Sequence, residues 1–406
     1  MMNPQFERLM QEAARLTQLT KSGDLQAATA AIQASLSAHL PGNQFDKGFA
    51  GQPASAKPRT GQVWRNFPAT AVDKKHEVID VEARDVSAPS CPSRQAAGAS
   101  TSPVSTPSTA TPFVNTFITG SYGEASNRRD FKLYIPPGAG QRPLPLVVML
   151  HGCTQNPDDF AAGTAMNEAG RAQGFFVLYP EQSQKANPQR CWNWFKHSHQ
   201  ARGRGEPALL AGMTRDTIAR YAIDADRIYI AGLSAGGAMA AIMGQAYPDL
   251  FAAVGVHSGL AAYAANDLPS ALAAMSGNKG PMGNAGLLTG KTPASSNGPS
   301  DMPTIVFHGD ADNTVHPNNG DQVITAAVGM GSAVQAETVT AAGGRSSVRR
   351  VYRNDEGSVM AEHWLVKGAP HAWSGGNAQG SYTDPSGPDA SLEMMRFFMA
   401  HPRRAS

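Results

Sequence analysis

The sequence predicts an α/β fold in which a mostly parallel β-sheet carries helices on both faces. From about Phe113 onward, short continuous apolar runs alternate with amphipathic stretches, and this alternation is typical of parallel strands that are buried on both sides. The second observation is the pentapeptide Gly232-Leu233-Ser234-Ala235-Gly236, which separates one such run from a stretch of small residues. A Gly-x-Ser-x-Gly turn between a strand and a helix holds a serine in a strained conformation at the carboxyl end of a sheet.

The predicted elements follow this alternation along the chain. Runs rich in aliphatic and aromatic residues predict strands at 131–135, 146–150, 175–179, 227–231, 252–256 and 304–307, with a final pair at 348–353 and 361–367. Helical spacing predicts helices around 161–173, 208–221, 235–247, 321–328 and 391–399. The segment 260–302, rich in Gly, Ser, Asn and Ala, interrupts the alternation and is predicted to be an insertion over one edge of the active site.

The chain divides into three predicted parts. Apolar residues near helical spacing on both sides of Lys21-Ser22-Gly23-Asp24 predict a short helical hairpin over residues 1–40. Residues 41–112 are rich in Pro, Ser, Thr, Ala and Gly with little apolar periodicity, which indicates a flexible, disordered linker. The folded catalytic domain is predicted over residues 113–402.

Composition and charge exclude several classes of function. The 34 basic and 32 acidic residues leave a formal charge of +2, without the broad basic field that binds nucleic acid. No stretch reaches the roughly 18–20 apolar residues of a transmembrane segment, and the N-terminus lacks the basic and apolar regions of a signal peptide, so the sequence predicts a cytoplasmic protein. The 3 cysteines, Cys91, Cys153 and Cys191, are too few for a disulfide scaffold.

Ser234 needs partners, because a serine hydroxyl is a poor nucleophile at neutral pH. A histidine must take its proton and a carboxylate must fix the tautomer of that histidine; in sheets of this kind their chain order is serine, acid, histidine. The loop after the strand at 304–307 contains Asp310 and Asp312. Asp312 is the preferred acid because it lies further past the strand and can reach across towards a histidine, whereas Asp310 is expected to stabilise the turn.

His371 is the preferred base. It follows the acid, lies in a Gly- and Pro-containing loop after the last strand, and precedes the closing helix. His308 and His316 share the loop of the acid and would leave no separate histidine loop. The remaining candidates are interpreted as ordinary solvated or hydrogen-bonded residues: His257, His363 and His401.

Acyl transfer also requires N–H donors aimed at the developing oxyanion. The backbone N–H of Ala235, directly after the nucleophile, is one predicted donor of this oxyanion hole. The second is the N–H of Cys153, because the strand at 146–150 leads into His151-Gly152-Cys153, where the glycine lets the backbone approach a substrate closely. The alternative is that His151-Gly152 simply ends the strand in a tight turn.

Two questions about this region stay open at the level of the sequence. Cys153 and Cys191 lie in loops of the same region, and they either form a disulfide that pins the oxyanion loop or remain buried free thiols, which a reducing cytoplasm favours. Trp192 and Trp194 lie in an aromatic-rich loop, and they either line a substrate pocket or pack the interior of that loop.

The sequence implies no cofactor and no metal. Asp310, Asp312 and Asp321 match a calcium loop only in part, since Val315 stands where an EF-hand needs glycine and the bidentate glutamate is absent. No His/Cys cluster has the spacing of a zinc site, and no dinucleotide-binding or phosphate-binding glycine loop follows a strand.

Taken together, these motifs resemble the polyhydroxybutyrate (PHB) depolymerase family of esterases, which is related to bacterial feruloyl and acetyl-xylan esterases. The resemblance covers the chain from about Phe113 to His401 and rests on Leu150-His-Gly-Cys-Thr-Gln155, Cys191-Trp-Asn-Trp-Phe195, Asp226-Arg-Ile-Tyr-Ile-Ala-Gly-Leu-Ser-Ala-Gly-Gly237, Gly309-Asp-Ala-Asp-Asn-Thr-Val315 and Pro370-His-Ala-Trp373. It implies an α/β-hydrolase fold with the type I arrangement. By this likeness Ser234 is the nucleophile, Asp312 the acid, His371 the base and Cys153 an oxyanion donor.

The resemblance implies a serine hydrolase that cleaves carboxylic esters, expected to be a short-chain polyhydroxyalkanoate depolymerase or oligomer esterase. The alternatives are a feruloyl or acetyl-xylan type carbohydrate-ester esterase and, outside enzymes, a non-catalytic binding module on the same fold. Family members that attack extracellular polymer carry a signal peptide, so an intracellular esterase is the expectation and secretion is the alternative. The hairpin is expected to dock on a granule surface or a protein partner, or to self-associate.

Overall fold

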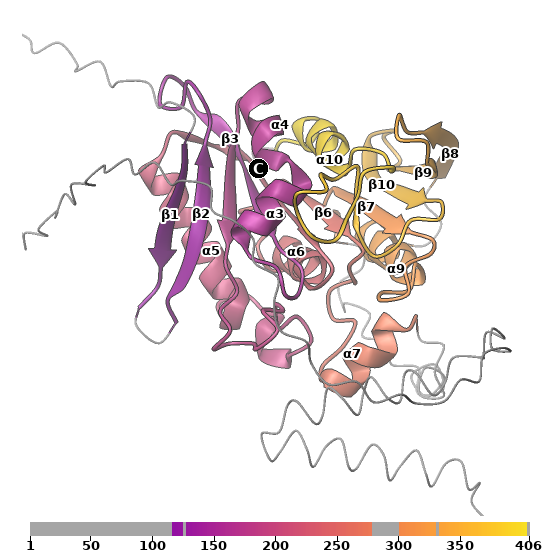
Figure 1. Ribbon diagram of the computed structural model, residues 1–406, viewed down its shortest axis with the longest axis horizontal. Coiled ribbons are helices and arrows are strands. Elements are labelled where there is room, and N and C mark those ends of the chain that lie inside the picture. Colours follow the sequence, from indigo (N-terminus) through magenta and orange to yellow (C-terminus); the bar gives the residue numbers. More distant parts are fainter. Residues whose placement is uncertain (1–115, 125–126, 278–299, 330–332, 404–406) are drawn as a thin grey trace, which may run out of the picture. The chain divides into compact units, whose positions relative to one another are not determined.

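A computed structural model of the chain describes residues 116–124, 127–277, 300–329 and 333–403. Within them, a 10-stranded sheet has the order β1-β2-β4-β3-β5-β6-β7-β10-β9-β8 (Figure 1). The six central strands are parallel to one another: β4, β3, β5, β6, β7 and β10. At one edge β1 and β2, and at the other β9 and β8, are antiparallel to their neighbours. The predicted hairpin over 1–40 and the predicted linker over 41–112 lie outside the described residues.

All predicted strands are present, and each begins or ends within a few residues of its predicted bounds. The strands are β1 Thr116–Tyr122, β2 Arg129–Ile135, β3 Leu144–Leu150, β4 Phe176–Pro180, β5 Ile223–Leu233, β6 Ala253–His257, β7 Thr304–Gly309, β8 Ala333–Thr340, β9 Ser346–Arg353 and β10 Val359–Val366, with the short pair β11 Trp373–Ser374 and β12 Thr383–Asp384. The edge strands β1 and β8 were not predicted. Their side chains are largely half-buried or exposed, so they lack the continuous apolar run that marks a central strand.

The helices also follow the prediction, with two differences. They are α3 Pro157–Thr164, α4 Met166–Gln173, α5 Gly205–Arg220, α6 Ala235–Ala246, α7 Leu268–Met275, α9 Asn318–Val328 and α10 Ala390–Met399. The single helix predicted at 161–173 is two helices, because Ala165 adopts a left-handed conformation (φ 51°) that ends α3. The predicted insertion contains α7, whose start is fixed by reciprocal capping between Asp267 and Ser270.

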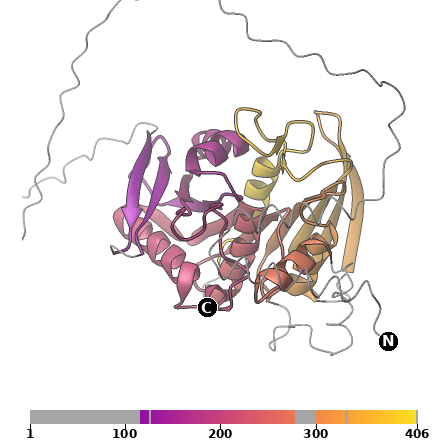
Figure 2. The ribbon, with the colours of Figure 1, turned by 60° about the horizontal axis from the view of Figure 1, so that its bottom comes forward.

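Apolar side chains alternate between two cores along each central strand. In β3, Leu146 and Val148 point into one cluster of buried residues, and Val147 and Met149 point into the other. Helices α5, α6 and α9 cover the first cluster, and α3, α4 and α10 cover the second; Figure 2 shows the two groups on opposite sides of the sheet. The prediction of a sheet covered on both faces is therefore confirmed.

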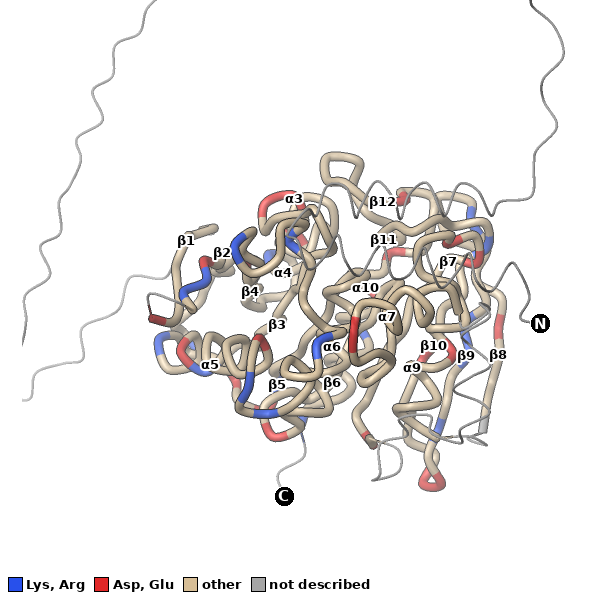
Figure 3. Tube along the Cα trace, turned by 90° about the horizontal axis from the view of Figure 1, so that it is seen from below, with Lys and Arg blue, Asp and Glu red and all other residues tan. Residues whose placement is uncertain are grey.

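The surface of the described residues carries both signs of charge. Lys and Arg are interspersed with Asp and Glu along the trace (Figure 3), and several are paired in ion bridges such as Arg215–Asp249. In the part of the chain that the structure covers, every helix is too short or too polar to traverse a bilayer.

Candidate active site

Ser234 stands at the junction of β5 and α6 in a strained backbone conformation, with φ 57° and ψ −119°. Its N–H donates a hydrogen bond to the carbonyl oxygen of His257 at 2.9 Å, which ties the turn to the end of β6. The flanking glycines are required by space: a Cβ on Gly236 would collide with the carbonyl oxygen of Leu150, and one on Gly232 with the backbone of Gly236. A serine forced into positive φ by a tight strand–turn–helix connection is the expected geometry of a nucleophile elbow.

Asp312 follows β7, and its buried carboxylate contacts His371. Its Oδ2 accepts a hydrogen bond from Nδ1 of His371 at 2.7 Å, and its Oδ1 accepts the backbone N–H groups of Thr314 and Val315, each at 2.9 Å. Burial raises the pKa of this carboxyl, but the hydrogen bonds from His308 and His371 outweigh it, so the pKa lies below its ordinary value. The carboxylate is therefore held ionised and in fixed orientation against the imidazole.

His371 lies in the loop between β10 and β11, with its side chain 11% exposed. Because its Nδ1 is the donor to Asp312, the Nε2 carries the lone pair that a general base needs. Asp310 does not contact this imidazole: it accepts the backbone N–H of Gly368 at 2.6 Å and lies 3.2 Å from Nζ of Lys367. Asp310 thus shapes the loop, as predicted, and Asp312 is the carboxylate beside the histidine.

The other histidines of the acid loop make different contacts. His308 is fully buried, with its Nε2 2.8 Å from the carbonyl oxygen of Val315 and 3.5 Å from Oδ2 of Asp312. It therefore lies behind the carboxylate. In His316, Nδ1 accepts the backbone N–H of Asn318 at 3.2 Å, at the start of α9.

His257 is a buried residue that joins the elbow to the loop of His371. Its carbonyl oxygen accepts the N–H of Ser234, and its ring Nε2 accepts the backbone N–H of Ser374 at 2.9 Å. The ring stacks on Trp373, with 5.0 Å between centroids. Burial lowers the pKa of this imidazole well below its ordinary value, and the nearby His308 and His371 lower it further. From the sequence His257 is expected to be an ordinary hydrogen-bonded residue, because no local pattern indicates that one side chain links two loops.

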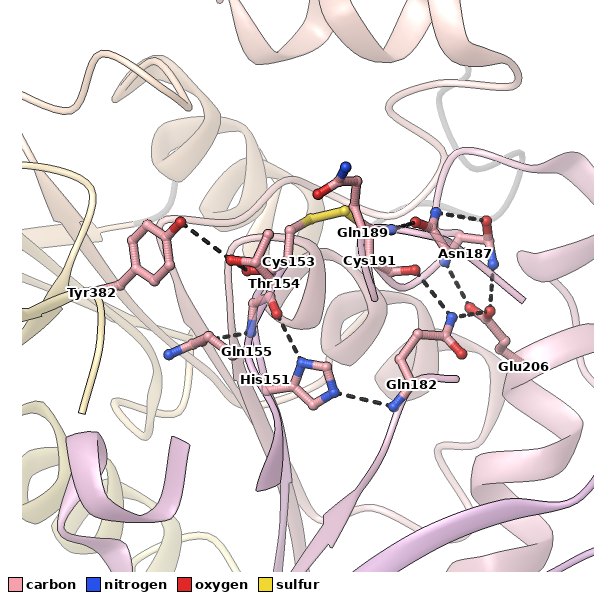
Figure 4. Close-up of a disulfide and its surroundings, with 12 residues drawn as sticks. His151, Cys153, Thr154, Gln155, Gln182, Asn187, Gln189, Cys191, Glu206 and Tyr382 are labelled. Carbon is pink, nitrogen blue, oxygen red and sulfur yellow. Dashed lines mark hydrogen bonds between the residues drawn. A yellow bond between two sulfur atoms is a disulfide. The ribbon is translucent and has the colours of Figure 1, made fainter. Parts of the chain in front are cut away.

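The loop that the sequence predicts to bind the oxyanion, residues 151–155 and called the oxyanion loop below, is oriented by His151 (Figure 4). This imidazole is buried, its Nδ1 donates to the carbonyl oxygen of Gly152 at 2.8 Å, and its Nε2 accepts the N–H of Gln182 at 3.1 Å. Burial lowers the pKa of His151 to about 4, so the ring is neutral at pH 7. Because C=O and N–H of a trans peptide point in opposite directions, the N–H of Cys153 faces away from His151.

A buried carboxylate holds the neighbouring loop in place. Glu206, in the first turn of α5, accepts hydrogen bonds from Nε2 of Gln182 at 2.5 Å and from Nδ2 and N of Asn193 at 2.6 and 2.7 Å. Burial raises its pKa, but hydrogen bonds from His199, Asn193 and Gln182 bring the pKa below its ordinary value. Figure 4 shows Glu206 and Gln182 converging beneath the disulfide. Glu206 carries no signal of this role in the sequence, since a glutamate in a first helical turn is ordinarily solvated.

Cys153 and Cys191 form a disulfide, with 4.2 Å between their Cα atoms. The alternative of two free thiols, left open by the sequence, does not hold. The bridge ties the oxyanion loop to the loop that Glu206 anchors.

Trp192 and Trp194 are both buried. Trp192 is fully buried and packs against the ring of His151, with 5.7 Å between centroids, and Trp194 is 5% exposed. Both belong to the apolar core under the oxyanion loop. Of the two roles that the sequence left open, packing inside the loop agrees with this burial, and the hydrogen bonds between Asn193 and Glu206 hold the same loop.

In the part of the chain that the structure describes, no group of three or more His, Cys, Asp or Glu side chains is arranged to hold a metal ion.

Comparison with known proteins adds independent findings. Residues 129–350 match the model of a family described as esterase PHB depolymerase. The chain is 30% identical over 246 residues to poly(3-hydroxyalkanoate) depolymerase C of Paucimonas lemoignei, covering 60% of this chain and 58% of that protein. It is 31% identical over 142 residues to acetylxylan esterase A of Emericella nidulans, covering 35% of this chain and 45% of that protein.

A solved structure shares the fold. The acetyl xylan esterase from Aspergillus awamori superposes with a TM-score of 0.54 at 19% identity, covering 70% of this chain and 99% of that one. The chain spans 58% or less of the length of the two curated relatives above.

Proposed function

This chain belongs to the esterase PHB depolymerase family, and from that premise we propose that it hydrolyses carboxylic esters through an acyl-enzyme on Ser234. The observation that carries the proposal is the 2.7 Å hydrogen bond between His371 and the buried carboxylate of Asp312, in loops at the same sheet edge as the strained Ser234. Nucleophile, acid and base then follow one another in the chain order that this sheet requires.

The proposed reaction begins when Nε2 of His371 takes the hydroxyl proton of Ser234 and Oγ attacks the ester carbonyl. The tetrahedral intermediate collapses, His371 returns the proton to the leaving alcohol, and the acyl-enzyme forms. Water, activated by the same imidazole, attacks the acyl carbon and releases the carboxylic acid. Asp312 remains ionised throughout, because its pKa is low, and it stabilises the transient imidazolium.

The oxyanion is proposed to accept hydrogen bonds from the backbone N–H groups of Ala235 and Cys153. Ala235 is the first residue of α6, where free N–H groups and the helix dipole favour negative charge. The His151–Gly152 hydrogen bond supports the role of Cys153, since it turns the carbonyl of the shared peptide away. Each such donor contributes roughly 10²–10³ in rate.

Polyhydroxyalkanoate or its oligomers are the proposed substrates. The match to a protein named poly(3-hydroxyalkanoate) depolymerase spans 246 residues, against 142 residues for the acetylxylan esterase. The alternative is a carbohydrate ester, because the site fixes the acyl chemistry and not the leaving group. A panel of hydroxybutyrate oligomers, amorphous polymer granules, feruloyl esters and acetylated xylan distinguishes them: kcat/KM at least tenfold higher on the oligomers is expected, and the reverse order overturns the assignment.

The catalytic proposal is tested at Ser234 itself. A fluorophosphonate probe should label Ser234 in the wild-type chain, and Ser234→Ala should remove both labelling and turnover, lowering kcat on the order of 10⁶-fold with the melting temperature unchanged. A chain that binds esters without labelling would instead be a non-catalytic binding module on the same fold.

The compartment and the role of the first 112 residues are further proposals. A disulfide beside the site is typical of oxidising compartments, so it supports the secretion alternative over a cytoplasmic location.

Docking of the predicted hairpin on a granule surface or a protein partner is tested by deleting residues 1–112; unchanged granule binding and oligomeric state would contradict it.

A further inference from the structure

Tyr382 is an exposed aromatic residue held beside the oxyanion loop. Its side chain is 45% exposed, and its backbone has a left-handed φ of 52°. Its hydroxyl lies 3.3 Å from Oγ1 of Thr154, and its carbonyl oxygen accepts the N–H of Trp373 at 2.7 Å. Tyr382 therefore contacts the loop that carries Cys153, as Figure 4 shows, and also the segment that begins two residues after His371.

The direction of the hydroxyl contact follows from hydrogen counting. Oγ1 of Thr154 donates its only hydrogen to the carbonyl oxygen of Cys153 at 2.6 Å. The phenol of Tyr382 must therefore donate to Thr154. Two hydrogen bonds, from Tyr382 to Thr154 and from Thr154 to Cys153, therefore join this aromatic residue to the peptide segment proposed to bind the oxyanion.

Both residues of this contact are conformationally strained. Thr154 has φ 67°, and β-branched or bulky residues are outliers at positive φ. Neither residue is a glycine, which would adopt this conformation freely. Strain of this kind persists where the surrounding structure imposes it, and it concentrates at functional sites.

The loop that carries Tyr382 is fixed on its other side as well. The preceding residue, Ser381, donates its N–H to Asp159 at 2.8 Å, and its carbonyl oxygen accepts from Nε2 of Gln155 at 3.1 Å. The backbone next to Tyr382 and its hydroxyl are thus both held by hydrogen bonds, while almost half of the residue faces solvent. An aromatic surface that is already ordered loses little entropy when an apolar group packs against it.

We propose that the ring of Tyr382 packs against the ester unit next to the scissile bond, and that it selects oligomeric and polymeric esters over single esters. The inference rests on the proposed function, since it assumes that the oxyanion loop binds the reacting carbonyl. A chain of hydroxyalkanoate units offers aliphatic groups on both sides of each ester, and such groups suit an aromatic face. A single ester of a small alcohol reaches no further than the reacting carbonyl.

The test compares a hydroxybutyrate trimer with p-nitrophenyl butyrate, using full-length protein. Tyr382→Gly should lower the ratio of kcat/KM for trimer over single ester about tenfold, which corresponds to about 1.4 kcal/mol. Tyr382→Phe keeps the ring and should lower the ratio less than threefold. Leu392→Ala is the matched control, because Leu392 is also exposed (48%) but lies on α10, and the ratio should stay at the wild-type value.

Stability separates a substrate contact from a structural role. Glycine relieves the strain at φ 52°, so Tyr382→Gly should melt at or above the wild-type temperature while losing the preference for the trimer. An unchanged ratio, equal losses in Tyr382→Phe and Tyr382→Gly, or a lower melting temperature would each overturn the inference. If the wild-type chain is not labelled by fluorophosphonate at Ser234, the esterase proposal itself fails, which is a different outcome.

Discussion

The imidazole of His257 accepts the backbone N–H of Ser374 through its Nε2 at 2.9 Å. The same residue accepts the N–H of Ser234 through its carbonyl oxygen, also at 2.9 Å. One residue at the end of β6 therefore sets the position of the serine turn relative to the segment that follows His371. Because Nε2 is an acceptor in this contact, the ring is neutral, in agreement with the lowered pKa that its burial causes.

Removing this acceptor should impair catalysis more than binding. His257→Phe keeps an aromatic ring against Trp373 but leaves the buried N–H of Ser374 unsatisfied, at a cost of about 1–3 kcal/mol. We expect kcat to fall tenfold or more with KM within threefold of wild type. His257→Gln, whose amide oxygen can replace Nε2, should recover part of the loss. Steady-state kinetics with both variants, alongside their melting temperatures, checks this; equal kcat for the two would contradict it.

The carboxylate beside His371 should be essential for rate. Asp312→Asn removes the charge and permits the wrong tautomer of the imidazole, so we expect kcat to fall by roughly 10⁴. Asp310→Asn is the matched control, since that carboxylate contacts Gly368 and Lys367 instead, and a fall below tenfold is expected. Single-turnover acylation rates measure the effect directly, and similar losses in the two variants would count against Asp312 as the acid.

Opening the disulfide should loosen the oxyanion loop. The Cys153–Cys191 bridge closes a segment with a sequence separation of 38 residues, for which the loss of chain entropy corresponds to about 3–4 kcal/mol of stability. Cys191→Ser should lower the melting temperature and reduce kcat about tenfold. Dithiothreitol should reproduce both effects in the wild type and change nothing further in Cys191→Ser. Reduced protein with full kcat would show that the bridge does not support the oxyanion site.

Acid should destabilise the fold through His151. Its pKa is about 4 in the folded chain, against 6.5 for an unperturbed histidine, so between these pH values the unfolded chain binds more protons. Stability is therefore complete above about pH 6.5 and declines as the pH falls towards 4, by about 3 kcal/mol at most. His151→Asn keeps a donor for Gly152 but cannot titrate, and it should flatten this slope. Denaturant unfolding at pH 7 and pH 4.5 tests it; parallel losses in both proteins would refute the assignment.

Much of the sheet was predictable because its signals are local. A central parallel strand is apolar on both faces, so β3 and β7 stand out as continuous runs. The turn at Ser234 could be predicted for a similar reason. Its glycines at 232 and 236 are required locally, because neighbouring backbone lies where a Cβ would be. Edge strand β8 carries no such signal, because its exposed side chains resemble those of a loop.

The sequence by itself determined the parallel sheet, the turn of Ser234 and the order of the loops that carry Asp312 and His371, since apolar runs and glycine positions act over a few residues. Only the tertiary structure decided that Cys153 pairs with Cys191, that Trp192 is buried, that His257 joins two loops and that Tyr382 reaches Thr154. The last two contacts join residues 117 and 228 positions apart. Contacts between residues so far apart leave no periodic pattern in the sequence, because they form only once the sheet has brought its carboxyl-end loops together.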